Sequence, residues 1–65
     1  MKVNYELKAL RARKDISQKG IANILHMTVS TYNRKENGGR EFTIDEAKLL
    51  ASFFNTTIEN IFFKE

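Results

Sequence analysis

Hydrophobic residues recur along the chain at helical spacing, and they do not alternate strictly with polar residues over the length of a strand. The clearest example begins at Thr43 and Glu46, which have the Thr-x-x-Glu spacing of a helix capping box. The apolar face that follows this box consists of Ile44, Ala47, Leu50, Ala51 and Phe54. The chain has no proline and only three glycines, so little interrupts helix formation. An all-α fold is therefore predicted.

Four shorter helices are expected from the same periodicity and from hydroxyl caps. Ser17, Thr28 and Thr57 each precede a segment with apolar residues at helical spacing and are good N-caps. Asn55 and the two glycines after Asn37 favour the left-handed backbone at which helices end. The shorter helices are expected at about residues 4–14, 18–25, 29–36 and 58–62. Together with the capping-box helix they form a compact five-helix bundle.

The composition limits the kinds of site that the chain can hold. Its 65 residues suffice for one domain, expected to span residues 1–65, with a core of aliphatic and aromatic packing alone. There is no cysteine and only one histidine, so neither a disulfide nor a metal site is expected. No apolar run approaches the thickness of a bilayer, and the N-terminus lacks the apolar stretch of a secretory signal. We expect no membrane association and a cytoplasmic location.

Positive charge is concentrated in the first part of the chain. Residues 1–40 contain nine Lys or Arg and three acidic residues, a net +6, whereas residues 41–65 contain two Lys and five acidic residues, a net −3. These values sum to the net charge of +3. The asymmetry favours a polyanionic partner, although small domains also carry uneven charge on a solvated surface.

The segment from Gln18 to Asn37 has the layout of a helix-turn-helix. A short helix, a tight turn and a polar helix follow one another, as required when the first helix braces the second in a DNA groove. Ala22 provides a small side chain where two helices cross closely, and Tyr32 is expected to pack inward. Any small helical hairpin has similar apolar spacing, so the spacing alone does not distinguish a DNA-binding helix-turn-helix from an ordinary helical hairpin.

The chain resembles the phage repressor and Cro-like helix-turn-helix family, also called lambda repressor-like, over nearly its whole length. The resemblance rests on Leu10-Arg11, Ile16-Ser17-Gln18, Ile21-Ala22, Leu25, Met27-Thr28, Tyr32, Glu36-Asn37-Gly38 and the run from Phe54 to Phe62. Residues 32–38, followed by Phe42-Thr43, are similar to the subset found in phage repressors of Gram-positive bacteria. The resemblance implies a Cro/repressor-type transcriptional regulator that binds double-stranded DNA sequence-specifically, on the nucleoid of a bacterial or phage-infected host.

The resemblance also implies which residues of the third helix, Val29 to Glu36, contact bases in the major groove. Arg34 is the strongest candidate, because its planar guanidinium can meet guanine O6 and N7 together, a contact worth about 1–3 kcal/mol of discrimination. A solvated or phosphate-bound Arg34 is the alternative. Val29 suits a thymine methyl group, and Ser30 suits either base. The implied base-contacting residues are Thr28, Val29, Ser30 and Arg34, with Asn33 at the edge of the set.

Other positions are implied to contact the DNA backbone or to hold the third helix. Gln18 opens the second helix, where family members touch a phosphate beside the helix N-terminal amides. The remaining implied phosphate contacts are Lys19, Lys35, Asn37 and Arg40. Arg11 and Glu36 occupy positions that pair with each other, and removal of one partner would leave an uncompensated charge.

Three residues depart from the family pattern. His26 stands in the turn where the family has glycine, at a position that needs a left-handed backbone. Gly20 lies inside the second helix, at a cost of about 1 kcal/mol relative to alanine. Lys35 replaces an apolar residue, so a slight rotation or shallower packing of the third helix is expected.

Partners follow from the small size of the domain. Family members dimerise on palindromic half-sites about 34 Å apart, so a weak homodimer on a palindromic operator is expected. The dimer interface is expected at Ile58, Phe62 and Phe63, because together they supply more apolar surface than one short helix buries within its own subunit. In the alternative, Phe62 belongs to the core and only Phe63 is exposed. No cofactor, small-molecule substrate or enzymatic activity is expected, because the sequence offers no convergent catalytic site. The alternative function is a protein-binding module on the same fold, such as an antitoxin, adaptor or anti-repressor.

Overall fold

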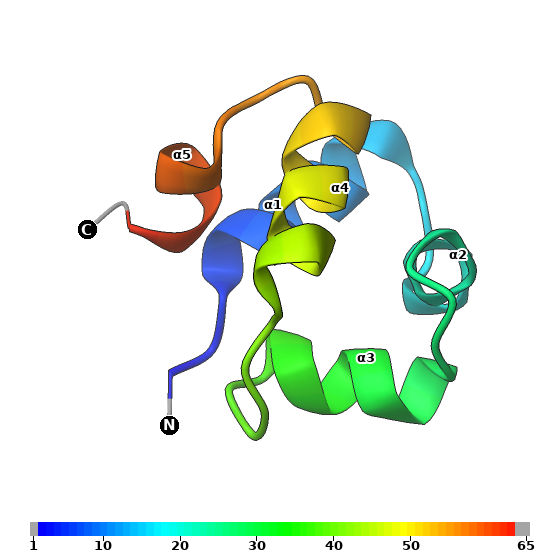
Figure 1. Cartoon of the computed structure of the whole chain (residues 1–65). Helices are drawn as coiled ribbons and strands as arrows, with labels where there is room; N and C mark the ends of the chain where they lie inside the picture. Colours follow the sequence, from blue (N-terminus) through cyan, green and yellow to red (C-terminus); the bar gives the residue numbers. More distant parts are fainter. Residues whose placement is uncertain (1, 64–65) are drawn as a thin grey trace.

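The computed structural model describes residues 2–63, and this part of the chain consists of five α-helices without a strand (Figure 1). The helices are α1 (Tyr5–Lys14), α2 (Gln18–Ile24), α3 (Val29–Glu36), α4 (Ile44–Phe53) and α5 (Ile58–Phe62). The predicted all-α, five-helix bundle is therefore confirmed. Residues 1, 64 and 65 of the predicted domain lie outside the described residues. None of the helices in residues 2–63 is long and apolar enough to cross a membrane.

Each helix begins after a side chain that accepts a hydrogen bond from the backbone of its first turn. The caps are Asn4, Ser17, Thr28, Thr43 and Thr57. The hydroxyl caps agree with the sequence prediction, and Thr43 and Glu46 form the expected capping box. The Asn4 cap is an addition to that prediction. Local capping therefore determines where the helices begin.

The first four helices end at residues with positive φ, which are Asp15, His26, Gly38 and Asn55. The predicted left-handed backbone at His26 and Asn55 is confirmed, with φ values of 59° and 55°. After α2, the Met27 amide donates to the Ala22 carbonyl and the His26 amide donates to the Asn23 carbonyl. These bonds form a Schellman motif, which satisfies the last carbonyls of the helix. His26 accordingly makes the turn of the helix-turn-helix in a conformation that glycine adopts at lower cost.

The end of α3 is held by the N-terminal segment, residues 2–4, which precedes α1. Gly38 has a φ of 87°, and a Cβ at this position would lie 2.5 Å from the carbonyl oxygen of Lys2. The Asn4 amide donates to the Glu36 carbonyl at 2.8 Å, and the Asn4 side chain donates to the Ile61 carbonyl at 3.1 Å. Residues near the N-terminus therefore connect the end of α3 to α5, and Gly38 leaves the space for this approach.

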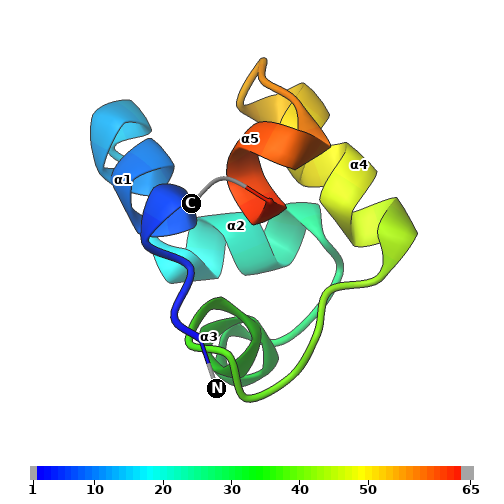
Figure 2. The ribbon, with the colours of Figure 1, turned by 90° about the vertical axis from the view of Figure 1, so that its left-hand side faces the viewer.

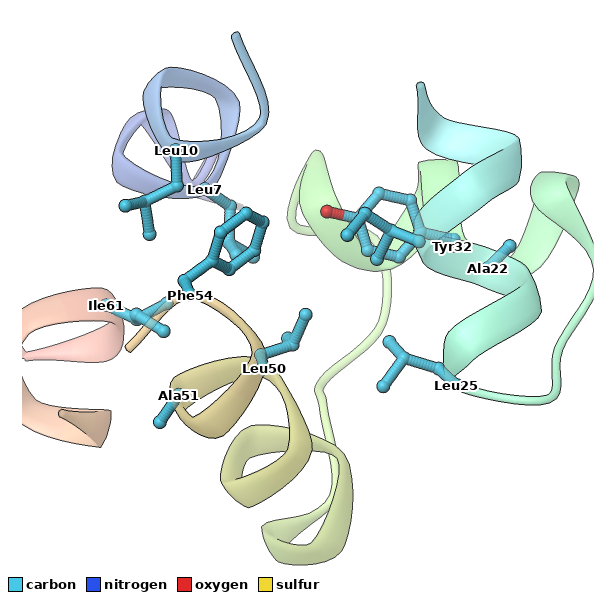
Figure 3. Packing of buried hydrophobic residues seen from close by; sticks show 10 residues of the cluster. Leu7, Leu10, Ala22, Leu25, Tyr32, Leu50, Ala51, Phe54 and Ile61 are labelled. Atoms are coloured by element: carbon cyan, nitrogen blue, oxygen red, sulfur yellow. The ribbon is translucent and has the colours of Figure 1, made fainter. Parts of the chain in front are cut away.

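The core draws residues from every helix or its caps (Figure 3). Its members are Leu7, Leu10, Ile21, Ala22, Leu25, Tyr32, Leu50, Ala51, Phe54 and Ile61. Ala22 and Tyr32 are buried, as predicted. A Cβ on Gly20 would lie 2.8 Å from Cγ1 of Ile16, so the close packing of Ile16 on α2 accounts for the glycine inside this helix. Ile44 departs from the prediction: it is 67% exposed rather than part of the buried face of α4.

α2 and α3 cross steeply at one edge of the bundle. Figure 1 shows α2 nearly end-on and α3 along the bottom of the view, and Figure 2, a quarter turn away, shows the reverse. In both views α3 is the lowest helix, and the other helices lie above it. α3 therefore packs on the bundle through one face and leaves its opposite face uncovered by any helix of residues 2–63.

Candidate nucleic-acid interface

One side of α3 is exposed and carries the residues predicted to contact bases. Residues four positions apart lie next to each other on a helix, which places Val29 beside Asn33 and Ser30 beside Arg34. All four are exposed, as is Thr28 at the N-cap. We call this surface the recognition face; it consists of Thr28, Val29, Ser30, Asn33 and Arg34. The structure thus brings the predicted base-contacting residues together on the exposed side of α3, which is the lowest helix in Figure 2.

The buried face of α3 consists of Tyr32, Lys35 and Glu36. The fully buried carboxylate of Glu36 accepts two hydrogen bonds from Arg11, from Nε at 2.7 Å and from Nη2 at 2.9 Å. The Tyr32 hydroxyl donates to the same carboxylate at 2.7 Å, and Nε2 of Gln18 donates to it at 3.0 Å. The expected Arg11–Glu36 pair is thus present with bidentate geometry, and α2 and α3 each add a donor to it.

These hydrogen bonds keep Glu36 charged although it is buried. Burial alone would raise the pKa of the Glu36 carboxyl, but the bonds from Arg11, Tyr32 and Gln18 outweigh it and hold that pKa below its usual value. Burial and the bond to Glu36 raise the pKa of Tyr32, so the phenol stays protonated as a donor. The bond to Glu36 also raises the pKa of Arg11. Because α1, α2 and α3 all contribute, this cluster fixes how α3 is rotated about its own axis.

Lys35 does not lie on the recognition face. Its side chain is 6% exposed, and Nζ lies 2.6 Å from Oε1 of Glu46 and 5.8 Å from the ring centroid of Phe42. Burial opposes ionisation of Glu46, but the hydrogen bond from Lys35 outweighs it and lowers the pKa of this carboxyl. A buried ammonium paired with α4 cannot also reach a phosphate. The predicted phosphate contact of Lys35 is therefore corrected: the lysine fills its apolar position by pairing with Glu46.

Gln18 is turned toward α3 rather than outward. Its Nε2 donates to Glu36, and its Oε1 accepts a hydrogen bond from Nδ2 of Asn33 at 3.1 Å. Both ends of the Gln18 amide are thereby engaged with α3. A phosphate contact by this side chain would be limited to its second Nε2 hydrogen. The bond to Asn33 also links the recognition face directly to the buried cluster.

The other predicted phosphate contacts are Lys19, Asn37 and Arg40. Lys19, in the first turn of α2, and Arg40, in the loop after α3, are exposed. Asn37 is half-buried, and its Nδ2 donates to the Asn33 carbonyl at 2.8 Å. The Asn37 side chain therefore supports the last turn of α3, whereas the two basic side chains are exposed to solvent.

A groove of about 870 Å³ opens beside α5 and the N-terminal segment. Ile58 and Phe62 line it and are half-buried, and Phe63 at its edge is 73% exposed. Tyr5 and Ile44 add exposed apolar surface to the same groove. We call this feature the C-terminal groove. It brings together the three residues predicted for a dimer interface, and sequence reasoning missed the contributions of Tyr5 and Ile44.

The sequence matches the model of a protein family described as Helix-turn-helix over residues 7–61. This range covers α2, α3 and α4 completely and most of α1 and α5. No curated protein matches the sequence.

Proposed function

Because the chain belongs to the lambda repressor-like, Cro/C1-type family of DNA-binding helix-turn-helix domains, we propose that it is a repressor-type transcriptional regulator. In this proposal α3 enters the major groove of double-stranded DNA and reads the sequence there. The observation that carries the proposal is the exposed recognition face on a helix whose opposite face is anchored by Glu36. Base readout needs side chains held in register with base edges, and a helix fixed from behind meets that need.

Arg34 is the main base-reading residue in this proposal. It is exposed, and its guanidinium makes no ion pair within residues 2–63. Its planar fork matches the O6 and N7 acceptors of guanine. Val29, 44% exposed, suits a thymine methyl group, and the Ser30 hydroxyl suits either base. The hydroxyl of Thr28 already serves as the cap of α3, so its methyl group is the part offered to DNA.

Lys19 and Arg40 supply the charge for the DNA backbone in this proposal. Lys19 lies in the first turn of α2 and Arg40 in the loop after α3, and both are exposed, so both are available to phosphates when α3 sits in the groove. The first amides of α2, beside Gln18, add the partial positive charge of a helix N-terminus. Asn37 contributes by holding the end of α3. These contacts position the domain without specifying the sequence.

The proposal includes a homodimer formed through the C-terminal groove. Phe63, Tyr5 and Ile44 leave an apolar surface around it that a second copy would cover. Two copies related by a two-fold axis would place their α3 helices on palindromic half-sites about 34 Å apart. A Phe63→Glu variant should lose cooperative binding to a two-half-site duplex and keep its affinity for one half-site. Analytical ultracentrifugation that finds only monomer on a two-half-site duplex would contradict the dimer.

A salt titration tests whether DNA is the partner. The affinity of the chain for duplex DNA would be measured by fluorescence anisotropy at increasing salt concentrations. The logarithm of the affinity should fall linearly with the logarithm of the salt concentration, with a slope of about −0.9 per phosphate contact. A domain that binds no duplex, or that forms a salt-insensitive complex with another protein, would instead favour the alternative function as an antitoxin, adaptor or anti-repressor.

A further inference from the structure

A chain of hydrogen bonds leads from the buried cluster to the recognition face. Nε2 of Gln18 donates to Oε1 of Glu36 at 3.0 Å, and Oε1 of Gln18 accepts from Nδ2 of Asn33 at 3.1 Å. Glu36 is fully buried, whereas Asn33 is exposed beside Val29 and Arg34. Gln18 thus joins a carboxylate in the core to an amide on the recognition face through one pair of hydrogen bonds.

The carboxylate determines which way both amides point. An ionised carboxylate only accepts hydrogen bonds, so Gln18 must direct its NH₂ group to Glu36 and its oxygen to Asn33. That oxygen is itself an acceptor, so Asn33 must direct its own NH₂ group to Gln18. To reverse Asn33, Gln18 would also have to reverse, and an amide oxygen would then face the carboxylate. Hydrogen bonds to charged groups are among the stronger ones, which holds this order in place.

We propose that Asn33 is a specificity-determining residue whose orientation is set by this relay and which selects adenine. Once one Nδ2 hydrogen is given to Gln18, Asn33 retains Oδ1 and its second Nδ2 hydrogen. Oδ1 accepts from the N6 amino group of adenine while the hydrogen donates to N7, the bidentate pattern by which Asn reads this base. Guanine presents two acceptors at the same edge, so it leaves Oδ1 facing an acceptor. The inference rests on the proposed function, because it requires α3 to lie in the major groove.

Two variants and a matched control separate base selection from general DNA affinity. Asn33→Ala removes the reading amide, Gln18→Met removes the relay at nearly constant side-chain size, and Lys19→Ala removes a neighbouring exposed charge outside the relay. Each variant and the natural chain would be used to select duplexes from a random pool, and Kd values would be measured on the selected site with adenine or guanine at each position. Circular dichroism melting establishes that each variant is folded.

The relay predicts one position at which adenine preference depends on both Asn33 and Gln18. Asn33→Ala should reduce that preference by about 5- to 150-fold, the range of one bidentate base contact. Gln18→Met should reduce it by about 2- to 10-fold, because only part of the Asn33 population then has the competent orientation. Lys19→Ala should weaken binding to all sequences alike and leave the preference unchanged.

The possible failures of the two proposals give different results. If the natural chain selects no motif, the proposed function fails, and the inference fails with it. If the natural chain selects a motif but Asn33→Ala keeps its full base preference at every position, the inference alone is overturned. Uniform weakening by Gln18→Met without any change in preference would likewise overturn the relay, because it would show Gln18 acting only on phosphate or stability.

Discussion

The two faces of α3 have opposite chemistry. On the buried face, Glu36 accepts four hydrogen bonds and Lys35 is paired with Glu46 at 2.6 Å. On the recognition face, Arg34 forms no ion pair within residues 2–63, and Asn33 is joined to the rest of the domain through Gln18. The difference separates two tasks: the buried face determines how α3 sits, and the recognition face carries the side chains that we propose contact bases.

The largest expected effect lies on the buried face. Glu36→Ala would leave the Arg11 guanidinium and the Tyr32 hydroxyl without their acceptor, at a cost of about 3–5 kcal/mol in the free energy of unfolding. A domain of this size is stable by about 3–10 kcal/mol, so this variant should be partly or wholly unfolded at room temperature. Urea unfolding followed by circular dichroism measures the change.

An exposed acidic residue near the same helix serves as the control. Glu41→Ala should change the free energy of unfolding by no more than about 0.5 kcal/mol, because Glu41 is exposed. Equal, small effects of the two substitutions would show that the buried face does not anchor α3.

Acid should weaken the buried face next. The pKa values of Glu36 and Glu46 are lowered in the folded chain, whereas an unfolded glutamate titrates near pH 4.3. The stabilising contribution is therefore complete above about pH 5 and is lost as pH falls through the folded-state pKa values, because the unfolded chain binds protons first. The urea concentration at the unfolding midpoint should be similar at pH 7 and pH 5 and lower at pH 3.5. A midpoint that is unchanged down to pH 3.5 would contradict these assignments.

A smaller effect is expected at the turn that leads into α3. His26 has a φ of 59° and is exposed, so His26→Gly should raise the free energy of unfolding by about 1 kcal/mol through relief of backbone strain. His26→Ala, which keeps the Cβ, should change the Tm less. DNA affinity should stay the same in both variants, because His26 lies outside the recognition face. A lower Tm for His26→Gly would show that the imidazole makes a stabilising contribution.

The smallest effect distinguishes two basic residues near the end of α3. Arg40→Ala should reduce the slope of log affinity against log salt by about one phosphate contact, because Arg40 is exposed. Lys35→Met should leave the slope unchanged, because the ammonium of Lys35 is buried against Glu46. If Lys35→Met lowered the slope as much as Arg40→Ala, the assignment of Lys35 to the buried face of α3 would be wrong.

Most of the fold could be predicted because its determinants are local. Hydroxyl caps such as Ser17 and Thr28 act on amides three residues away, and the apolar spacing of a helix is visible within one or two turns. The left-handed position of His26 could also be expected, because it occupies the place of a turn glycine. The exposed side of α3 follows from the same local periodicity: once Tyr32 is assigned inward, Val29, Asn33 and their neighbours must face outward. Their role as base contacts is implied by the family resemblance and stays a prediction.

The rest depends on contacts between distant segments. The resemblance implies a phosphate contact for Lys35, but the burial of this side chain depends on Glu46, which the sequence pattern assigned to a capping box alone. The turn of Gln18 toward α3 requires one hydrogen-bond acceptor, Glu36, and one donor, Asn33, on another helix. Ile44 lies on the apolar stripe of α4 but is 67% exposed, because no other part of residues 2–63 covers this position. Such pairings are set by tertiary packing, and no short-range pattern encodes them.

The central claim is that the recognition face reads DNA, and selection of duplexes from a random pool with the natural chain and with Arg34→Ala tests it most directly. We expect the natural chain to enrich one motif that contains a guanine. Arg34→Ala should lose the preference for that guanine by about 5- to 150-fold and keep the Tm of the natural chain. A natural chain that enriches no motif, or an Arg34→Ala variant that enriches the same motif with the same preferences, would contradict the claim.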